Sequence, residues 1–506
     1  MVPIIVLILI TPSILCLVNA DLISDQSEPL FQRLWDSSAI GTGVAVDSTG
    51  NIYVTGITAA FGLGNLSAYR AVFLLKYDPT GNLVWQRVWS GNGNGTDYAS
   101  AAAVDSSGNI YVTGWTFSFG AGMGDILLLK FNSTGSLIWQ RTFGGSGDDQ
   151  GSGVAVDSSG NIYVTGGIQG GSGSDDVIIL KFDPSGEVLW QKSWGGTHFD
   201  YGGGVIVDSY GDIYVTGSTE SFGSGPESLF LLKLNSSGSL IWQKDWGPNY
   251  PKFATGEGIA IDSSGSIYVT GYYSFSIPDP DNVLDILLLK FDSSGNLMWQ
   301  RTWDSGSWDR AEDVAVDSYG GVYVTGCVLA HAGYDVLLVK FDSSGNQAGI
   351  VTWGNNAPGN SQKGYSVAVD SSGDAVVTGF VDFGPPYTMG YTNGTIGAPS
   401  FSLGVPSFTL DTPTFTPYTP GGVVQTPFVS EDNTGMANGA FLVKFMPLSY
   451  TETYAENIIG LPPMVFYGVI GSAVVLIGAL TMILLRRRKG KDVLQRPEVP
   501  KVQVKQ

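Results

Sequence analysis

The sequence contains very little cysteine and histidine. Its 506 residues include two cysteines, Cys16 and Cys327, and two histidines, His198 and His331. Zinc sites built from Cys and His need three or four such ligands at close spacing, and this class of site is therefore excluded. A Ser-His-Asp triad remains open, but no Gly-x-Ser-x-Gly context for its nucleophile stands out.

Long charged helical stretches are also missing. Only 14% of the residues are charged, whereas the chain contains 70 glycines and 12% aromatic residues. No segment before the last fifty residues keeps an apolar period of 3.6 residues. The composition therefore predicts an all-β, turn-rich fold.

Two apolar segments lie at the ends of the chain. Residues 1–20 end in Val-Asn-Ala and are expected to form a secretory signal, or an uncleaved anchor because the n-region contains no Lys or Arg. If the signal is cleaved, Cys16 leaves with it and no intramolecular disulfide is possible. Residues 464–485 carry no charge and are long enough to cross a bilayer as a helix. We expect residues 447–463 to form a stalk outside the membrane and residues 486–506 to form a basic cytoplasmic tail.

Charge changes sign at this border. Residues 486–506 contain eight Lys/Arg and two Asp/Glu, a net charge of +6, which leaves −26 for the rest of a chain whose total is −20. An acidic exterior disfavours nucleic acid and anionic membranes as partners. It is compatible with solubility or with bound cations.

A short motif of the form "VDSSGNIYVTG" recurs seven times. Successive copies are 51 to 58 residues apart, which is the length of a four-stranded propeller blade. The aspartates of the copies are Asp47, Asp105, Asp157, Asp208, Asp262, Asp317 and Asp370. Each repeat continues with a second strand–turn–strand segment such as "DILLLKFNSTGSLIWQRTF", and the sequence therefore predicts seven blades of four strands.

The seventh repeat lacks its own outermost strand. A spare copy, "LFQRLW" at residues 30–35, precedes the first repeat. We expect it to pair with the strand near Phe441–Phe445 and so close the ring, because closure removes bare strand edges. The propeller would span residues 21–446, with a Pro/Thr-rich insertion at about residues 381–439 in blade seven.

The repeat "GVAVDSSGNIYVTG" followed by "DILLLKFDSSGNLMWQRTW"-like segments resembles the SBBP-type β-propeller repeat of secreted prokaryotic proteins. The resemblance covers about residues 30–445, apart from the insertion. It implies a propeller, and together with the apolar ends it indicates a membrane-anchored surface protein of a prokaryote, notably of an archaeon. It implies no particular activity.

The seven turn aspartates admit two interpretations. They could form a ring of calcium ligands, or each could cap its own turn. Calcium needs several oxygens within about 2.5 Å of one ion, and these aspartates lie on seven different blades. The Asp-x-x-Gly pattern also recurs in the outer hairpins, which favours turn capping.

A second acidic set precedes the inner strands. Its members are expected in loops on the face opposite the Asp-x-x-Gly turns, where binding sites of rigid scaffolds usually lie. They could hold a cation such as calcium, or each could bond to the backbone at its strand start. The set comprises Asp97, Asp148, Asp149, Asp200 and Asp309. A third set lies five residues before a recurrent lysine of the third strand and is interpreted as strand-start residues, namely Asp125, Asp176, Asp285 and Asp335.

These observations favour a non-enzymatic cell-surface module for binding, adhesion or envelope scaffolding, with no resident cofactor. A protein or glycan ligand is expected on the face of the variable loops, which we call the loop face. The alternative is an extracellular hydrolase or lyase acting on polysaccharide through carboxylates of that face.

Overall fold

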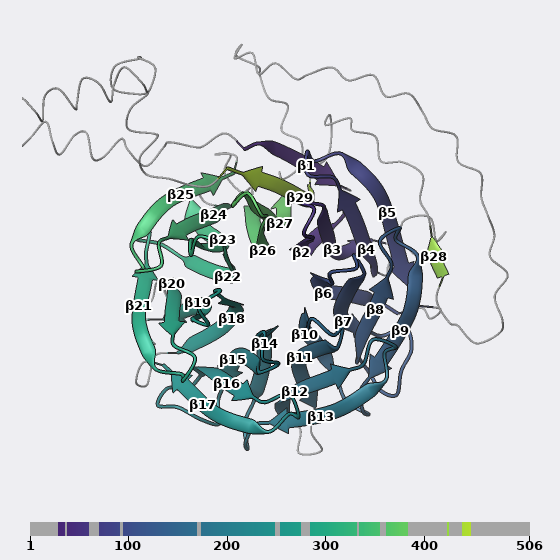
Figure 1. Ribbon diagram of the computed structural model, residues 1–506, viewed down its shortest axis with the longest axis horizontal. Coiled ribbons are helices and arrows are strands. Elements are labelled where there is room, and N and C mark those ends of the chain that lie inside the picture. Colours follow the sequence, from purple (N-terminus) through teal and green to yellow (C-terminus); the bar gives the residue numbers. More distant parts are fainter. Residues whose placement is uncertain are drawn as a thin grey trace, which may run out of the picture. The chain divides into compact units, whose positions relative to one another are not determined.

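The computed structural model shows a ring of seven β-sheets around a common axis (Figure 1). It describes residues 29–35, 38–59, 70–91, 95–169, 174–247, 253–274, 284–330, 333–354, 361–382, 422–424 and 438–446. The predicted all-β, seven-bladed propeller of four-stranded blades is confirmed. The expected signal, stalk, membrane helix and basic tail all lie outside the described residues. Within those residues there is no helix of the length and apolarity that a membrane span needs.

Each blade is an antiparallel sheet whose strands follow one another from the axis outward. Blades one to three contain β2 (Ile40–Val46), β3 (Ile52–Ala59), β4 (Arg70–Tyr77) and β5 (Leu83–Ser90); β6 (Asp97–Val104), β7 (Ile110–Thr116), β8 (Asp125–Phe131) and β9 (Leu137–Phe143); and β10 (Gln150–Val156), β11 (Ile162–Gln169), β12 (Asp175–Phe182) and β13 (Val188–Trp194). Blades four and five contain β14 (Asp200–Val207), β15 (Ile213–Thr219), β16 (Ser228–Leu234) and β17 (Leu240–Trp246); and β18 (Ala254–Ile261), β19 (Ile267–Ser274), β20 (Leu284–Phe291) and β21 (Leu297–Trp303). Blade six contains β22 (Asp309–Val316), β23 (Val322–Ala330), β24 (Gly333–Phe341) and β25 (Gln347–Trp353).

Blade seven is assembled from both ends of the described chain. Its inner strands are β26 (Ser361–Val369) and β27 (Ala375–Asp382), followed by β29 (Asn438–Phe445) and, outermost, β1 (Phe31–Trp35). In β1, Phe31 lies opposite Lys444 and Trp35 lies opposite Ala440. This is the pairing that the sequence predicted for residues 30–35, and it makes blade seven a four-stranded sheet like the others.

The insertion of blade seven is slightly shorter than the sequence indicated. β27 and β29 remain paired up to Asp382 and Asn438, so the first two and last two residues of the expected range 381–439 belong to strands. Within the range, β28 (Gly422–Val424) pairs with Val88–Ser90 of β5 and adds a fifth strand to blade one.

The hydrophobic core lies between neighbouring blades rather than at the centre of the ring. One cluster joins Tyr53 and Leu74 of blade one to Val112 and Leu127 of blade two, and equivalent clusters follow around the ring. Third strands such as β8 are buried along their whole length, because both faces of the blade are covered. Each blade is thus stabilised by its neighbours, which is why the ring needs to be closed.

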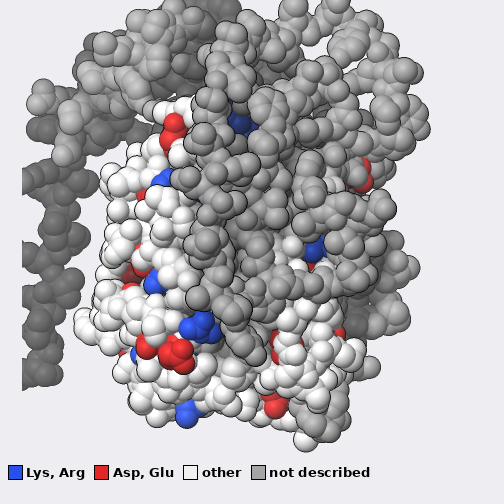
Figure 2. All heavy atoms as spheres, turned by 90° about the vertical axis from the view of Figure 1, so that its right-hand side faces the viewer, with Lys and Arg blue, Asp and Glu red and all other residues white. Residues whose placement is uncertain are grey.

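The outer strands add polar links from one blade to the next. The indole Nε1 of Trp89 donates a hydrogen bond to Oε1 of Gln140, one blade further on, at 3.1 Å. The same link joins Trp194 to Gln243 and Trp246 to Gln300. On the side of the ring shown in Figure 2, the described acidic and basic side chains are interspersed and do not gather into a large patch of one sign.

Candidate functional site

The seven turn aspartates make the hydrogen bonds of turn caps. In Asp157, Oδ1 accepts the backbone N–H groups of Ser159 and Asn161, each at 2.9 Å. The turn ends at Gly160, whose φ of 81° is accessible to glycine without steric cost. The remaining six, Asp47, Asp105, Asp208, Asp262, Asp317 and Asp370, accept the same two backbone bonds.

The second oxygen of these aspartates is also engaged. In five blades it accepts the hydroxyl of a tyrosine six residues later, as Asp157 does from Tyr163 at 3.0 Å. The recurrent lysine of the third strand lies over the same ring, and Lys181 Nζ is 5.0 Å from the ring centroid of Tyr163. Each turn carboxylate therefore caps its own turn and bonds to side chains of its own blade. This arrangement favours seven separate caps over one ion site.

The acidic residues of the loop face are distributed over four blade junctions. Asp97, Asp149, Asp200 and Asp309 are each fully buried at the start of an inner strand. Each accepts a backbone N–H from the loop before it, as Asp200 Oδ2 does from Gly196 at 2.8 Å. Asp148 lies beside Asp149, and its backbone N–H contacts Oε1 of Gln169 at 3.4 Å. The five predicted candidates therefore do not converge on a common site.

The structure instead pairs the second acidic set with the third. The aspartate that begins a third strand meets the aspartate that begins the inner strand of the following blade. At the junction of blades two and three, a Cβ built on Gly144 would collide with carboxylate oxygens of both Asp125 and Asp149. At the next junction, Gly195 lies in the same way between Asp176 and Asp200. In both pairs the aspartates are separated by 24 residues, a regularity that the sequence analysis missed.

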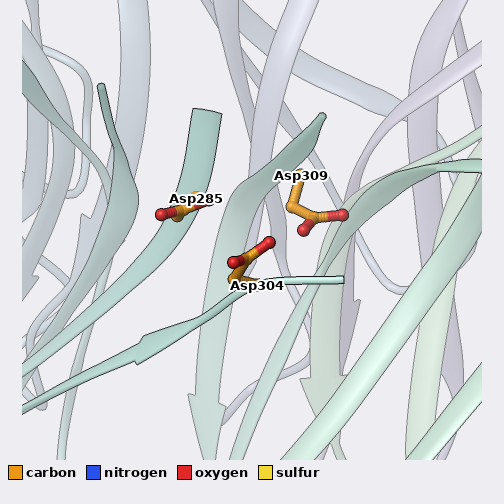
Figure 3. A group of neighbouring side chains, drawn as sticks. All are labelled: Asp285, Asp304 and Asp309. Carbon is orange, nitrogen blue, oxygen red and sulfur yellow. The ribbon is translucent and has the colours of Figure 1, made fainter. Parts of the chain in front are cut away.

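The junction of blades five and six brings together three carboxylates. Asp285 and Asp309 form the same pair, again 24 residues apart, and Asp304 occupies the position that Gly144 and Gly195 hold elsewhere. One oxygen from each residue lies within 4.8 Å of the others (Figure 3). Asp285 is 3% exposed and Asp309 is fully buried, whereas Asp304 is exposed.

The surroundings of Asp285 and Asp309 raise the pKa of both carboxyl groups. Burial, with the negative charges of Asp304 and Asp309, raises the pKa of Asp285 to about 6. Burial also raises the pKa of Asp309 to about 6, although two hydrogen bonds from Ser305 oppose the shift. Sequence reasoning had singled out Asp309, had assigned Asp285 to a strand start and had not considered Asp304.

A second departure from the repeat lies on the inner strands of blades five and six, close to the axis. The guanidinium of Arg310 on β22 contacts Glu257 of β18 at 3.1 Å and Glu312 of its own strand at 2.9 Å. It also lies over the ring of Tyr272, 4.5 Å from the centroid. We call Glu257, Arg310 and Glu312 the axial ion cluster. Burial raises the pKa of Glu312 to about 8 despite the opposing charge of Arg310.

The axial ion cluster is enclosed but still reached by solvent. The side chains of Arg310, Glu257 and Glu312 are 32%, 28% and 12% exposed to solvent. Lys363 of the next inner strand lies over Tyr334, at 4.4 Å, and its charge acts on Glu312. The formal charges of these four side chains sum to zero. The cluster was not predicted, because Glu257 and Arg310 are 53 residues apart and lie on different blades.

Comparison with known proteins identifies the repeat. The family model of the SBBP beta-propeller repeat matches residues 36–60 and 138–171. The chain is a β-propeller, and these two segments match the SBBP repeat. The two matches fall on the first inner hairpin and on the passage from blade two into blade three, and the other blades repeat the same strand plan.

Sequence relatives are distant and much longer. The chain is 21% identical to an uncharacterized WD repeat-containing protein of Acanthamoeba polyphaga mimivirus, over 50% of the chain and 26% of the relative. It is 28% identical to the regulatory protein FlaEY of Caulobacter vibrioides, over 20% of the chain and 12% of that protein. The chain thus spans about a quarter or less of the curated relatives that it matches.

Similar solved structures include two propellers. The WD40 domain of Pan2 from Neurospora crassa has a TM-score of 0.44 at 12% identity, with 70% of this chain and 93% of that chain covered. The propeller domain of the Trilobed protease from Pyrococcus furiosus has a TM-score of 0.40 at 10% identity, with coverage of 68% and 90%.

Proposed function

We propose that the propeller is a binding or scaffold module displayed on the surface of a prokaryotic, archaeal cell. Residues 1–20 direct export, residues 464–485 anchor the chain, and residues 486–506 stay in the cytoplasm. The support is the uncharged run of 22 residues followed directly by Arg486, Arg487, Arg488 and Lys489. Protease added to intact cells should leave an epitope at the C-terminus whole and digest the propeller, and loss of the epitope would refute this orientation.

The observation that carries the binding role is the loss of repeat symmetry near the axis. At the bulged position of the inner strands, blades one to four have the small residues Thr42, Ser100, Ser152 and Gly203. Blades five and six have Glu257 and Glu312 at this position. Building the fold requires no such difference, because the small residues suffice in four blades. A ligand that is recognised on one side of the axis accounts for it.

The chemistry near the axis suits a ligand with polar groups and flat apolar faces. Arg310 and Lys363 lie over aromatic rings and remain partly exposed. Tyr98 and Trp115 on blade two are also partly exposed, and their rings stack with centroids 4.5 Å apart. Ion pairs and aromatic faces together are typical of sites for peptides and glycans. The cluster lies toward the start of the inner strands, which is the end nearer the loop face. We therefore place the ligand at the axial part of the loop face.

The hydrolase or lyase alternative has one observation in its favour. Asp285 and Asp309 are carboxylates with pKa values raised to about 6, as a catalytic acid requires. Their burial opposes this role, because a sugar ring has to contact both a catalytic acid and its partner. The binding module is thus the function that the geometry supports best.

The binding role can be tested on the full-length protein with a glycan array and with peptide pull-down from cell-surface extracts. Lys363→Met removes a partly exposed charge near the axis, and Lys192→Met removes an exposed one from outer strand β13. We expect the first variant to weaken binding about 10-fold and the second to leave it unchanged, with both variants folded. Equal binding by both variants, or release of sugar products by the wild type, would overturn the proposal.

A further inference from the structure

We propose that Asp285, Asp304 and Asp309 bind a calcium ion that ties blade five to blade six. This inference concerns the blade junction and does not depend on the ligand proposed for the axis. The three residues come from separate places in the fold (Figure 3). Asp285 lies near the start of β20, Asp304 follows the end of β21, and Asp309 is the first residue of β22.

The other junctions serve as comparisons within the same molecule. Where blades two and three or blades three and four meet, the aspartate pair is present but the third position is a glycine. Where blades six and seven meet, Gly354 lies against Asp335 and Gln362, and only one carboxylate remains. The structural role of the pair is therefore fulfilled without a third acid. Adding Asp304 brings a third negative charge next to two others, which is unfavourable unless a cation is present.

The hydrogen bonds at the junction leave part of this charge unsatisfied. Asp309 accepts the backbone N–H and the hydroxyl of Ser305, and Asp304 accepts the N–H of Gly306. Asp285 accepts a hydrogen bond from Tyr273, but its Oδ1 is buried without any hydrogen-bond partner. Among the described residues, no Lys or Arg forms an ion pair with any of the three. Asp176 also has a buried, unpartnered Oδ1, but its junction holds only a pair of carboxylates, so the feature that points to a bound cation here is the unpartnered oxygen of Asp285 together with the third carboxylate of Asp304.

The donor atoms favour calcium over other biological metals. All three ligands are carboxylate oxygens, which suit hard cations and not zinc or copper. Calcium accepts irregular sets of six to eight oxygens, so loop carbonyls and water can complete its shell. Magnesium demands a near-ideal octahedron, which three carboxylates from two blades do not preset.

The test uses the full-length protein freed of metal with EDTA. Terbium, a calcium substitute, should luminesce on excitation of tryptophan, because Trp303 and Trp308 adjoin two of the ligands in sequence. Calcium should raise the melting temperature by several degrees, EDTA should reverse the shift, and magnesium should produce a smaller one. A wild type with neither terbium luminescence nor a calcium-dependent shift at millimolar calcium overturns the proposal.

The variants locate the ion. Asp304→Gly introduces the residue found at the three other junctions described above and should fold normally while losing at least about 10-fold in calcium affinity. Asp285→Asn should lose affinity without any change in side-chain volume. Glu187→Gln is the control. It removes one exposed carboxylate from the turn before outer strand β13, and the variant should bind calcium as the wild type does. If Asp304→Gly and Asp285→Asn both keep wild-type affinity, calcium binds elsewhere and the assignment is wrong.

Discussion

The indole Nε1 of Trp35 donates a hydrogen bond to Oε1 of Gln86, 3.0 Å away, and thereby joins blade seven to blade one. Trp89 makes the same link to Gln140 between the outer strands of blades one and two. Arg33 repeats a second link, because its Nε donates to the carbonyl of Gly81 as Arg87 donates to that of Gly135. The strand that comes from the N-terminus therefore closes the ring with the contacts used between ordinary blades.

Trp35→Ala should destabilise the propeller strongly. The side chain is 4% exposed and packs on Phe73 with ring centroids 4.4 Å apart, so its removal costs about 3–5 kcal/mol. Urea denaturation measures the loss, and limited proteolysis should show earlier cleavage near β29. Trp299→Ala is the matched control, because that half-buried indole of outer strand β21 bonds to the carbonyl of Ser343 and so joins two blades that are not closed by the N-terminal strand. Equal losses for the two variants would show that Trp35 has no special role in closure.

Asp47→Asn should remove a pH-dependent part of the stability. Burial alone would raise the pKa of Asp47, but hydrogen bonds from Thr49, Asn51 and Tyr53 outweigh it and lower the pKa to about 2. A lowered pKa stabilises the fold above the unfolded value of 3.8 and ceases to do so as the pH falls through 2. After allowance for solvent screening we expect the variant to be about 1 kcal/mol less stable at pH 7. Urea denaturation from pH 2 to 7 should show the difference vanish in acid, and a constant difference would contradict this explanation.

Arg310→Met should destabilise the protein more at high pH than at low pH. The change leaves Glu257 and Glu312 without their cation, and the pKa of Glu312 is already raised to about 8 by burial. A folded state that holds a proton which the unfolded state releases loses stability as the pH rises. We expect a loss of about 2–4 kcal/mol at pH 9 and a smaller loss at pH 5, measured by chemical denaturation. Arg141→Met, which breaks an exposed pair with Glu187, should show no such widening, and a pH-independent loss for Arg310→Met would contradict the coupling.

Cys327 should be inert in the native state. Its side chain is fully buried on β23, and burial raises the pKa of its thiol to about 12. In a Cys16→Ser background, a disulfide reagent such as DTNB at pH 8 should react only as the protein unfolds. The reaction rate then reports the opening of blade six, and calcium should slow it if the proposed ion joins blades five and six. Complete reaction of the native protein within minutes would contradict the observed burial.

The architecture could be predicted because it depends on local signals that are repeated. An Asp-x-x-Gly turn between apolar segments specifies a hairpin, and seven copies specify the number of blades. The spare strand at residues 30–35 was detectable because blade seven lacked the corresponding segment. Turn chemistry and strand count are properties of short stretches, and they can be read without knowing which stretches touch.

The clusters at the junctions could not be predicted in this way, because they depend on contacts between blades. Asp285 and Asp309 belong to different blades and had been placed in separate sets, although both recur with the same spacing of 24 residues as Asp125 and Asp149. Asp304 had not been considered, because its role depends on the two carboxylates that lie beside it only in the folded ring. Arg310 and Glu257 are 53 residues apart and meet only once the ring is formed.

The strand pairing in blade seven determines when the propeller can be completed during translation. β1 is the first of the described strands in the chain, and its partner β29 is the last. The four-stranded sheets of blades one to six can form during synthesis, because the strands of each are consecutive in sequence, and only β28, the fifth strand of blade one, follows later. Blade seven can form only after residue 445 has left the ribosome. A nascent chain that is interrupted before that point keeps an unpaired strand edge. Completion of the ring thus marks completion of the propeller's translation, and an unfinished chain exposes edges that chaperones and proteases can recognise.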